Sequence, residues 1–152
     1  MISKKQMSEH QLMKNVSWIT SNHPNTSYIF EDDEERPDLI ERYLSKIISN
    51  NAIILIVPIH RFRENNYSLR IEGPIDGYKI LNEIYHFYNH QKVTKKIIKD
   101  LNEDDVFDYV KKVKAKMNNN REVHYIDLMG DLIFFEGISK QMGNVYFLEL
   151  GS

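Results

Sequence analysis

One stretch decides the fold, residues 52–90, which read AIILIVPIHRFRENNYSLRIEGPIDGYKILNEIYHFYNH. It opens with a continuous apolar run at residues 52–57, which is typical of a strand covered on both faces and central in its sheet. Residues 67–71 then alternate between apolar and polar side chains, the period-two pattern of a half-buried strand. Together the two runs predict an antiparallel hairpin at the centre of the protein.

A helix follows this hairpin. The sequence Gly-Pro-Ile-Asp-Gly at residues 73–77 predicts a tight corner in which Asp76 caps the helix. The Asp76 carboxylate would then occupy the backbone N–H groups to which an anion could otherwise bind. Beyond the corner, apolar residues at helical spacing predict an amphipathic helix that continues to His90. The predicted buried stripe comprises Tyr78, Leu81, Ile84, Tyr85 and Tyr88. The opposite face carries Lys79, Asn82, Glu83, His86 and His90.

The N-terminal part of the chain is predicted to be largely helical. Residues 1–9 are expected to be mobile, and residues 11–20 carry apolar side chains at helical spacing. Trp18, the single tryptophan, is expected to dock this short helix onto the core. A second helix over residues 37–49 begins at Pro37, which suits the first turn.

The C-terminal half is predicted to add two helices and three strands. The helices cover residues 94–101, with Thr94 as the cap, and residues 102–117. The strands cover residues 123–129, 132–138 and 145–150. Turn residues separate the three strands, and a three-strand meander is the simplest topology that joins them.

These elements predict an α+β fold with a mainly antiparallel sheet of about five strands and helices packed on one face. We expect a single domain over residues 1–152, because this length supplies a sufficient core and no linker or repeat interrupts the chain. Within it, residues 10–50 form a helical N-terminal part and residues 52–150 form the core of sheet and helices.

The composition excludes several classes of function. The formal net charge of −2 gives no support to a protein that coats nucleic acid. The chain has no cysteine, which excludes disulfides, thiol nucleophiles and cysteine-ligated zinc. The N-terminus lacks the apolar stretch of a signal peptide, and the longest apolar run is too short to cross a bilayer. We therefore expect a soluble, intracellular protein that does not enter a membrane.

Basic and aromatic residues in the hairpin form the first candidate site. If the turn centres on residues 65–66, Arg61 lies opposite Arg70. The alternation of side chains along the strands then places Arg61, Arg63 and Arg70 on one face of the hairpin. A register shift of one residue would separate these arginines. Arginines beside an aromatic ring suit phosphate and base stacking, so this surface is a candidate for binding a nucleotide or RNA. The candidate binding residues are Arg61, Arg63, Arg70, His60 and Phe62.

The predicted helix offers a candidate metal site at Glu83, His86 and His90. Two histidines four residues apart place both rings on one helix face, as a divalent metal requires, and Glu83 lies one turn earlier. A solvated polar face explains the same three residues without a ligand.

Carboxylates around the C-terminal hairpin are a further candidate. Asp127, Asp131 and Glu136 could form a nuclease-like metal site, although a turn position for Asp131 and exposed strand positions for the other two account for them more simply. No nucleophile elbow, phosphate loop or zinc-protease motif occurs in the sequence. The sequence thus favours a non-enzymatic protein without a cofactor.

Three segments carry a resemblance to a known group of proteins: LRIEGPIDGYKILNEIYHFYNH, DLMGDLIFFEGI and VYFLELGS. Over residues 52–150 the chain resembles uncharacterised small α+β proteins of giant, AT-rich DNA viruses of the mimivirus type. The resemblance implies a viral accessory protein acting in the cytoplasm of the infected cell, and it brings no catalytic residues.

The leading hypothesis is a non-enzymatic viral accessory or interaction module that binds protein partners or self-associates. The alternative is a nucleotide- or RNA-binding accessory protein that uses the arginine-bearing hairpin. A metal-dependent enzyme at Glu83, His86 and His90 is the second alternative.

Overall fold

The computed structural model describes residues 11–60, 66–101 and 109–152. The predictions for residues 1–9, for residues 61–63 of the hairpin and for the start of the helix expected at residue 102 lie outside these ranges.

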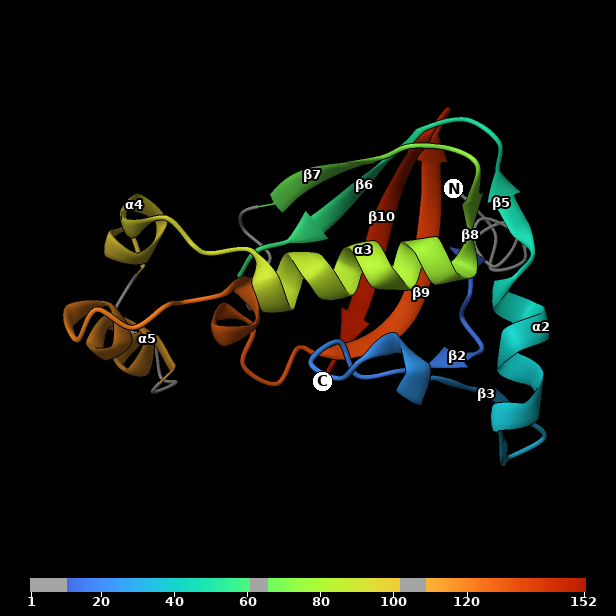
Figure 1. Ribbon diagram of the computed structural model, residues 1–152, viewed down its shortest axis with the longest axis horizontal. Helices are drawn as coiled ribbons and strands as arrows, with labels where there is room; N and C mark the ends of the chain where they lie inside the picture. The colour runs from blue at the N-terminus through green and yellow to red at the C-terminus, as the bar shows by residue number, and fades with distance from the viewer. Residues whose placement is uncertain (1–10, 61–65, 102–108) are drawn as a thin grey trace, which may run out of the picture.

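A five-stranded sheet forms the centre of the fold, in the order β1-β9-β10-β6-β7 (Figure 1). Its strands are β1 (Gln11–Leu12), β9 (Phe134–Met142), β10 (Val145–Gly151), β6 (Ile53–Pro58) and β7 (Asn66–Ile71). Three of the four pairings are antiparallel, and β10 runs parallel to β6. The predicted class is confirmed: the fold is α+β, with a five-stranded sheet that is mainly antiparallel and mixed at one pairing.

Helix α3 (Gly77–His90) lies across one face of this sheet (Figure 1). Its N-terminus is capped as predicted, because Asp76 Oδ1 accepts a hydrogen bond of 2.9 Å from the backbone N–H of Lys79. The helix buries Gly77, Ile80, Leu81, Ile84, Phe87 and Tyr88 against the sheet. The predicted buried stripe is therefore correct for Leu81, Ile84 and Tyr88 but not for Tyr78 and Tyr85, which are only partly buried.

Phe87 is buried because residues from distant parts of the chain cover it. Its ring stacks on Tyr125 with centroids 4.5 Å apart, and it lies 5.1 Å from the ring of Tyr67. Aromatic contacts of this kind stabilise a ring beyond the area it buries.

The first part of the chain does not form the predicted helix over residues 11–20. It forms β1 and β2 (Val16–Ser17), joined by a turn in which Met13 adopts a left-handed conformation with φ of 63°. Pairing of β1 with the outer edge of β9 supplies backbone hydrogen bonds from a distant segment, which local spacing does not report. Trp18 is buried in the core as predicted and packs against Phe135, but the segment that it anchors is not a helix.

Strands and turns dominate the region predicted as helical before residue 50. Its further elements are η1 (Pro24–Thr26), β3 (Tyr28–Glu31), β4 (Glu34–Arg36), η2 (Pro37–Leu39), α2 (Ile40–Leu44) and β5 (Ile47–Ser49). The helix expected over residues 37–49 begins near Pro37 but ends at Leu44. It ends there because the next residues, as β5, pair with β8 (Ile75–Asp76) at the corner before α3.

The second half of the chain confirms the predicted strand pair β9 and β10 but not the meander. Residues 123–129 form the turn η3 (Tyr125–Leu128) instead of a strand, because Asp127 Oδ2 accepts from the backbone N–H of His124 and the Asp127 N–H donates to the His124 carbonyl oxygen. Helices α4 (Lys95–Lys99) and α5 (Tyr109–Asn118) lie beside the sheet (Figure 1). Thr94 caps α4 as predicted.

The hydrophobic core lies between α3 and the sheet and draws on residues from Met13 to Leu150. No helix in the described ranges is long and apolar enough to cross a membrane.

Candidate functional site

The hairpin that was predicted to gather three arginines has a different register. Asn66 lies opposite Pro58, so residues 59–65 connect the two strands, and the turn does not centre on residues 65–66. Arg70 consequently faces Ile54 on β6, and the predicted pairing of Arg61 with Arg70 is wrong. The error arose because the sequence pattern defines the strand face but leaves the length of the connection open.

The charge of Arg70 is balanced by Glu72, two residues further along the chain. Its Nε donates to Glu72 Oε1 over 2.7 Å, and both side chains are about two-thirds exposed. His60 is half-buried, and residues 61–63 lie outside the described ranges. Within the described residues the hairpin thus contributes one arginine, and the nucleotide or RNA hypothesis remains a prediction.

The predicted metal ligands lie on α3, where two of them approach each other. The rings of His86 and His90 are exposed, with centroids 5.1 Å apart. Tyr85 lies between this pair and His23, at centroid distances of 5.4 Å from His90 and 5.3 Å from His23. No group of three or more His, Asp or Glu side chains in the described ranges could hold a metal ion. The helix therefore presents two imidazoles, and Glu83 does not complete a three-ligand group with them.

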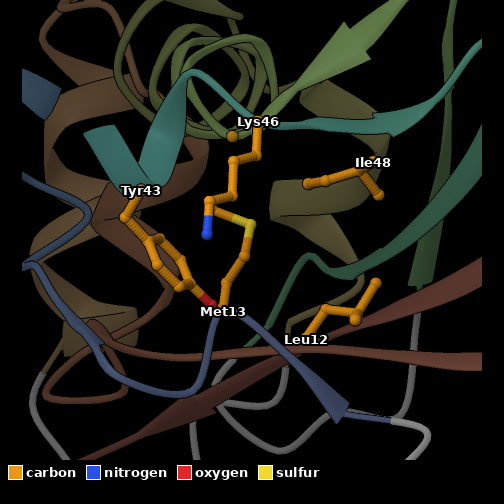
Figure 2. Close-up of a pocket in the computed structure, with 6 residues that line it drawn as sticks. Leu12, Met13, Tyr43, Lys46 and Ile48 are labelled. Carbon is orange, nitrogen blue, oxygen red and sulfur yellow. The ribbon is translucent and has the colours of Figure 1, made fainter. Parts of the chain in front are cut away.

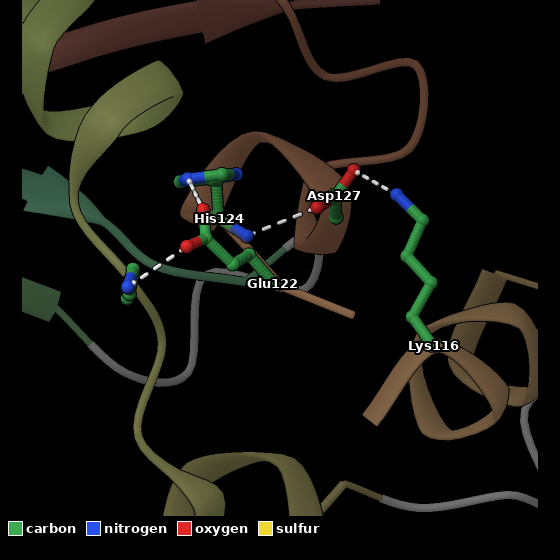
Figure 3. Close-up of polar contacts among 5 residues, drawn as sticks. Lys116, Glu122, His124 and Asp127 are labelled. Atoms are coloured by element: carbon green, nitrogen blue, oxygen red, sulfur yellow. Dashed lines mark hydrogen bonds and ion pairs between the residues drawn. The ribbon is translucent and has the colours of Figure 1, made fainter. Parts of the chain in front are cut away.

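A network of charged groups joins α5, η3 and the segment after α3 (Figure 3). Lys116 Nζ lies 3.1 Å from Asp127 Oδ1, while Asp127 Oδ2 accepts from the backbone N–H of His124 over 3.0 Å. Glu122 lies 2.9 Å from Lys92 Nζ and 3.7 Å from His124 Nε2. The hydrogen bond from Lys92 lowers the pKa of the Glu122 carboxyl below its ordinary value. Each of these groups is paired with another member of the network, which ties α5 and η3 to the segment after α3.

The C-terminal carboxylates do not gather into the nuclease-like site considered above. Asp127 belongs to the η3 turn, Asp131 to the loop that follows, and Glu136 to β9. The side chain of Glu136 lies over Gly151 on the neighbouring strand, where an added Cβ would collide with it.

The face of the sheet away from α3 carries the feature that sequence reasoning missed. Along β6 and β10 the side chains alternate between the buried core face and this second face. The parallel register places Ile54 beside Val145 and Ile56 beside Phe147. These four half-buried apolar side chains form one contiguous surface, which we call the open-face patch (Ile54, Ile56, Val145 and Phe147).

Polar groups border the open-face patch on both sides. Ser68 and Arg70 of β7 lie opposite Ile56 and Ile54, and on β9 the Ser139 hydroxyl donates to Glu149 Oε1 over 2.8 Å. Near one end, Met142 pairs with Val145 and is 81% exposed. At the other end, a hollow of about 200 Å³ lies between the carboxyl ends of β6 and β10. It is lined by Ile56, Pro58, Asn66, Phe147, Leu148, Glu149 and Leu150.

Among the described helices, α3 alone lies across the sheet, and α2, α4 and α5 lie beside it (Figure 1). The open-face patch thus combines an apolar centre with a polar border and a hollow at one end. The sequence signal for the open-face patch was the apolar run over residues 52–57. It indicated that both faces of this strand are buried, whereas in the structure a helix covers one face.

The fold and this surface define the class as an α+β protein whose mixed sheet is covered by one long helix. Comparison of the chain with protein-family models, with curated proteins and with solved structures finds no match.

Proposed function

We propose that this protein is a non-enzymatic interaction module that self-associates through the open-face patch. The observation that carries the proposal is the row of four apolar side chains, Ile54, Ile56, Val145 and Phe147, on the sheet face that no described helix crosses. An apolar sheet face gains free energy when a second layer covers it, at about 25 cal/mol for each Å² removed from water.

A second copy of the chain is the partner that fits this surface most simply. Two sheets pack face to face at about 10 Å, with their inner side chains interdigitated. A two-fold axis between the copies would bring the same patch from each chain together, which is the usual arrangement of homodimers. Phe147 is the largest side chain of the patch and lies beside the hollow at the end of β10, so we assign it the central anchoring role.

Light scattering coupled to size-exclusion chromatography tests the proposal over a range of protein concentrations. We expect a dimer for the unaltered chain and a monomer for Phe147→Glu, because the carboxylate would be buried without a partner in the interface. The matched control is Phe30→Glu, the same change on β3, where the ring is 48% exposed and lies away from the patch.

The control variant should remain dimeric, and circular dichroism should show that both variants are folded. An unaltered chain that stays monomeric at the highest concentration, or a Phe147→Glu variant that dimerises as tightly as Phe30→Glu, would contradict the proposal.

The proposed setting of this interaction is an infected cell, where the chain would serve as a viral accessory protein. This part of the proposal is supported by the resemblance of residues 52–150 to proteins of giant DNA viruses. Expression during infection, measured as the protein's abundance in the infected cytoplasm over time, tests it directly.

A further inference from the structure

A small apolar pocket lies at the other side of the molecule, between the β1–β2 turn, the α2–β5 junction and the start of α3 (Figure 2). It has a volume of about 130 Å³ and is lined by Leu12, Met13, Tyr43, Lys46, Ile48 and Gly77. An apolar cavity of about 150 Å³ is large enough to bind benzene. The pocket therefore has room for a short alkyl chain or a single ring.

The walls of the pocket come from segments that are distant in sequence. Met13 occupies the left-handed position of its turn, and its side chain is buried. Tyr43 belongs to α2, whose end is tied down by the pairing of β5 with β8.

Lys46 gives this apolar pocket one positive charge. Its ammonium lies between the side chains of Tyr43 and Met13 (Figure 2). Among the described residues, none forms a hydrogen bond or an ion pair with the Lys46 side chain. Lys46 is exposed, so its ammonium lies at the mouth of the apolar space, where a positive charge attracts an anionic group on whatever occupies that space.

A second hollow, of about 320 Å³, lies on the other side of Tyr43 and Lys46 and shares both residues. Its lining adds Arg42 and Glu31 to the charged groups at this rim, so two cations face one carboxylate. The net positive charge suits a monoanion. A dianion would meet the repulsion of Glu31 and a larger dehydration cost.

We propose that this pocket binds a small carboxylic acid as its monoanion. The short apolar tail occupies the space between Leu12, Met13 and Ile48, and the carboxylate lies at the rim beside Lys46. Arg42 in the adjoining hollow adds a second favourable charge. The site shares no residue with the open-face patch, so it stands independently of the proposed self-association.

Calorimetric titration of the full chain with hexanoate tests the proposal, together with three comparison ligands. Hexanol keeps the tail and lacks the charge, acetate keeps the charge and lacks the tail, and inorganic phosphate is an anion without a tail. We expect hexanoate to bind at least tenfold more tightly than any of the three, because only hexanoate satisfies both parts of the site.

Two variants locate the site. Lys46→Gln removes the charge but keeps most of the stem, and it should weaken hexanoate at least tenfold, whereas Lys99→Gln on the distant helix α4 should leave the affinity unchanged. Ile48→Phe should fill the pocket and abolish binding, with its folding checked by circular dichroism. Absent heat with hexanoate, equal affinity for hexanol or phosphate, or equal affinity in Lys46→Gln and Lys99→Gln would each overturn the proposal.

Discussion

The hydroxyl of Tyr88 offers the most direct test of how α3 is held against the sheet. Its side chain is fully buried, and Oη donates a hydrogen bond of 2.6 Å to the carbonyl oxygen of Pro58 at the end of β6. No buried side-chain polar atom in the described ranges lacks a partner. Replacing Tyr88 with Phe removes one oxygen atom and leaves the packing of the ring in place.

The expected loss of stability depends on the Pro58 carbonyl, which the substitution leaves without its hydrogen-bond donor. A buried acceptor that loses its partner costs about 1–3 kcal/mol, and the phenyl ring recovers part of this because it needs no dehydration of a hydroxyl. We expect Tyr88→Phe to lower the free energy of unfolding by about 1–2 kcal/mol. For a chain of this length, that corresponds to a fall of about 2–8 °C in Tm.

Urea denaturation followed by circular dichroism measures this difference, with an unchanged m-value as the sign that the unfolded state is the same. Tyr85→Phe is the matched control on the same helix, because no hydrogen bond joins the Tyr85 hydroxyl to another described residue. The control should change the free energy of unfolding by less than about 0.5 kcal/mol. Equal effects of the two substitutions would refute the assigned role of the Tyr88 hydroxyl.

The same side chain predicts a pH dependence. Burial raises the pKa of Tyr88 well above its ordinary value of 10.0. The unfolded chain therefore releases this proton first as the pH rises above about 10, and the folded state loses stability by up to about 1.4 kcal/mol per pH unit for this group. Tyr88→Phe should lose stability less steeply in this range than the unaltered chain. Parallel curves for the two proteins would show that the hydroxyl is not shielded from water.

Two further predictions concern a surface ion pair and Gly137, which lies where β9 has one residue more than β10 between two paired positions. Gly137→Ala should lower Tm severely, because φ is 105° and the new Cβ would lie 2.5 Å from the Leu12 carbonyl oxygen. Gly143→Ala is the control: φ there is 60° with open space around it, so the free energy of unfolding should fall by only about 1–2 kcal/mol. Similar thermal shifts for the two variants would disprove the close approach of β1 to β9. The pKa of Glu122, measured by NMR titration, should lie below its model-compound value and rise toward it in Lys92→Met, since the lysine hydrogen bond is the main cause of the lowering. Its stabilising effect should be present at neutral pH and disappear as the pH falls through the lowered pKa, and a Glu122 titration unaffected by Lys92→Met would exclude the pair.

Local signals in the sequence were sufficient for several elements. The alternation over residues 67–71, the helical stripe after Asp76 and the cap at Thr94 each depend on side chains a few residues apart, and each element formed where it was predicted. These patterns succeed because strand and helix periodicity are properties of a short segment.

The candidate sites were harder to predict for the same reason. The position of Arg70 depended on the length of the hairpin connection, and the open-face patch depended on the parallel pairing of β10 with β6. The pocket beside Lys46 required the β1–β2 turn, α2 and α3 to meet. No periodicity within one segment reports which distant segment will become its neighbour.

The sequence by itself determined the α+β class, the strand β6 with a neighbour on each side, the helix α3 with its Asp76 cap, and the strand pair β9 and β10. Only the tertiary structure decided that residues 11–20 form strands, that residues 123–129 form a turn, and that β10 pairs with β6 in parallel. The physical reason is that these outcomes depend on backbone hydrogen bonds and burial supplied by remote segments, which override the weak propensities of a short stretch of chain.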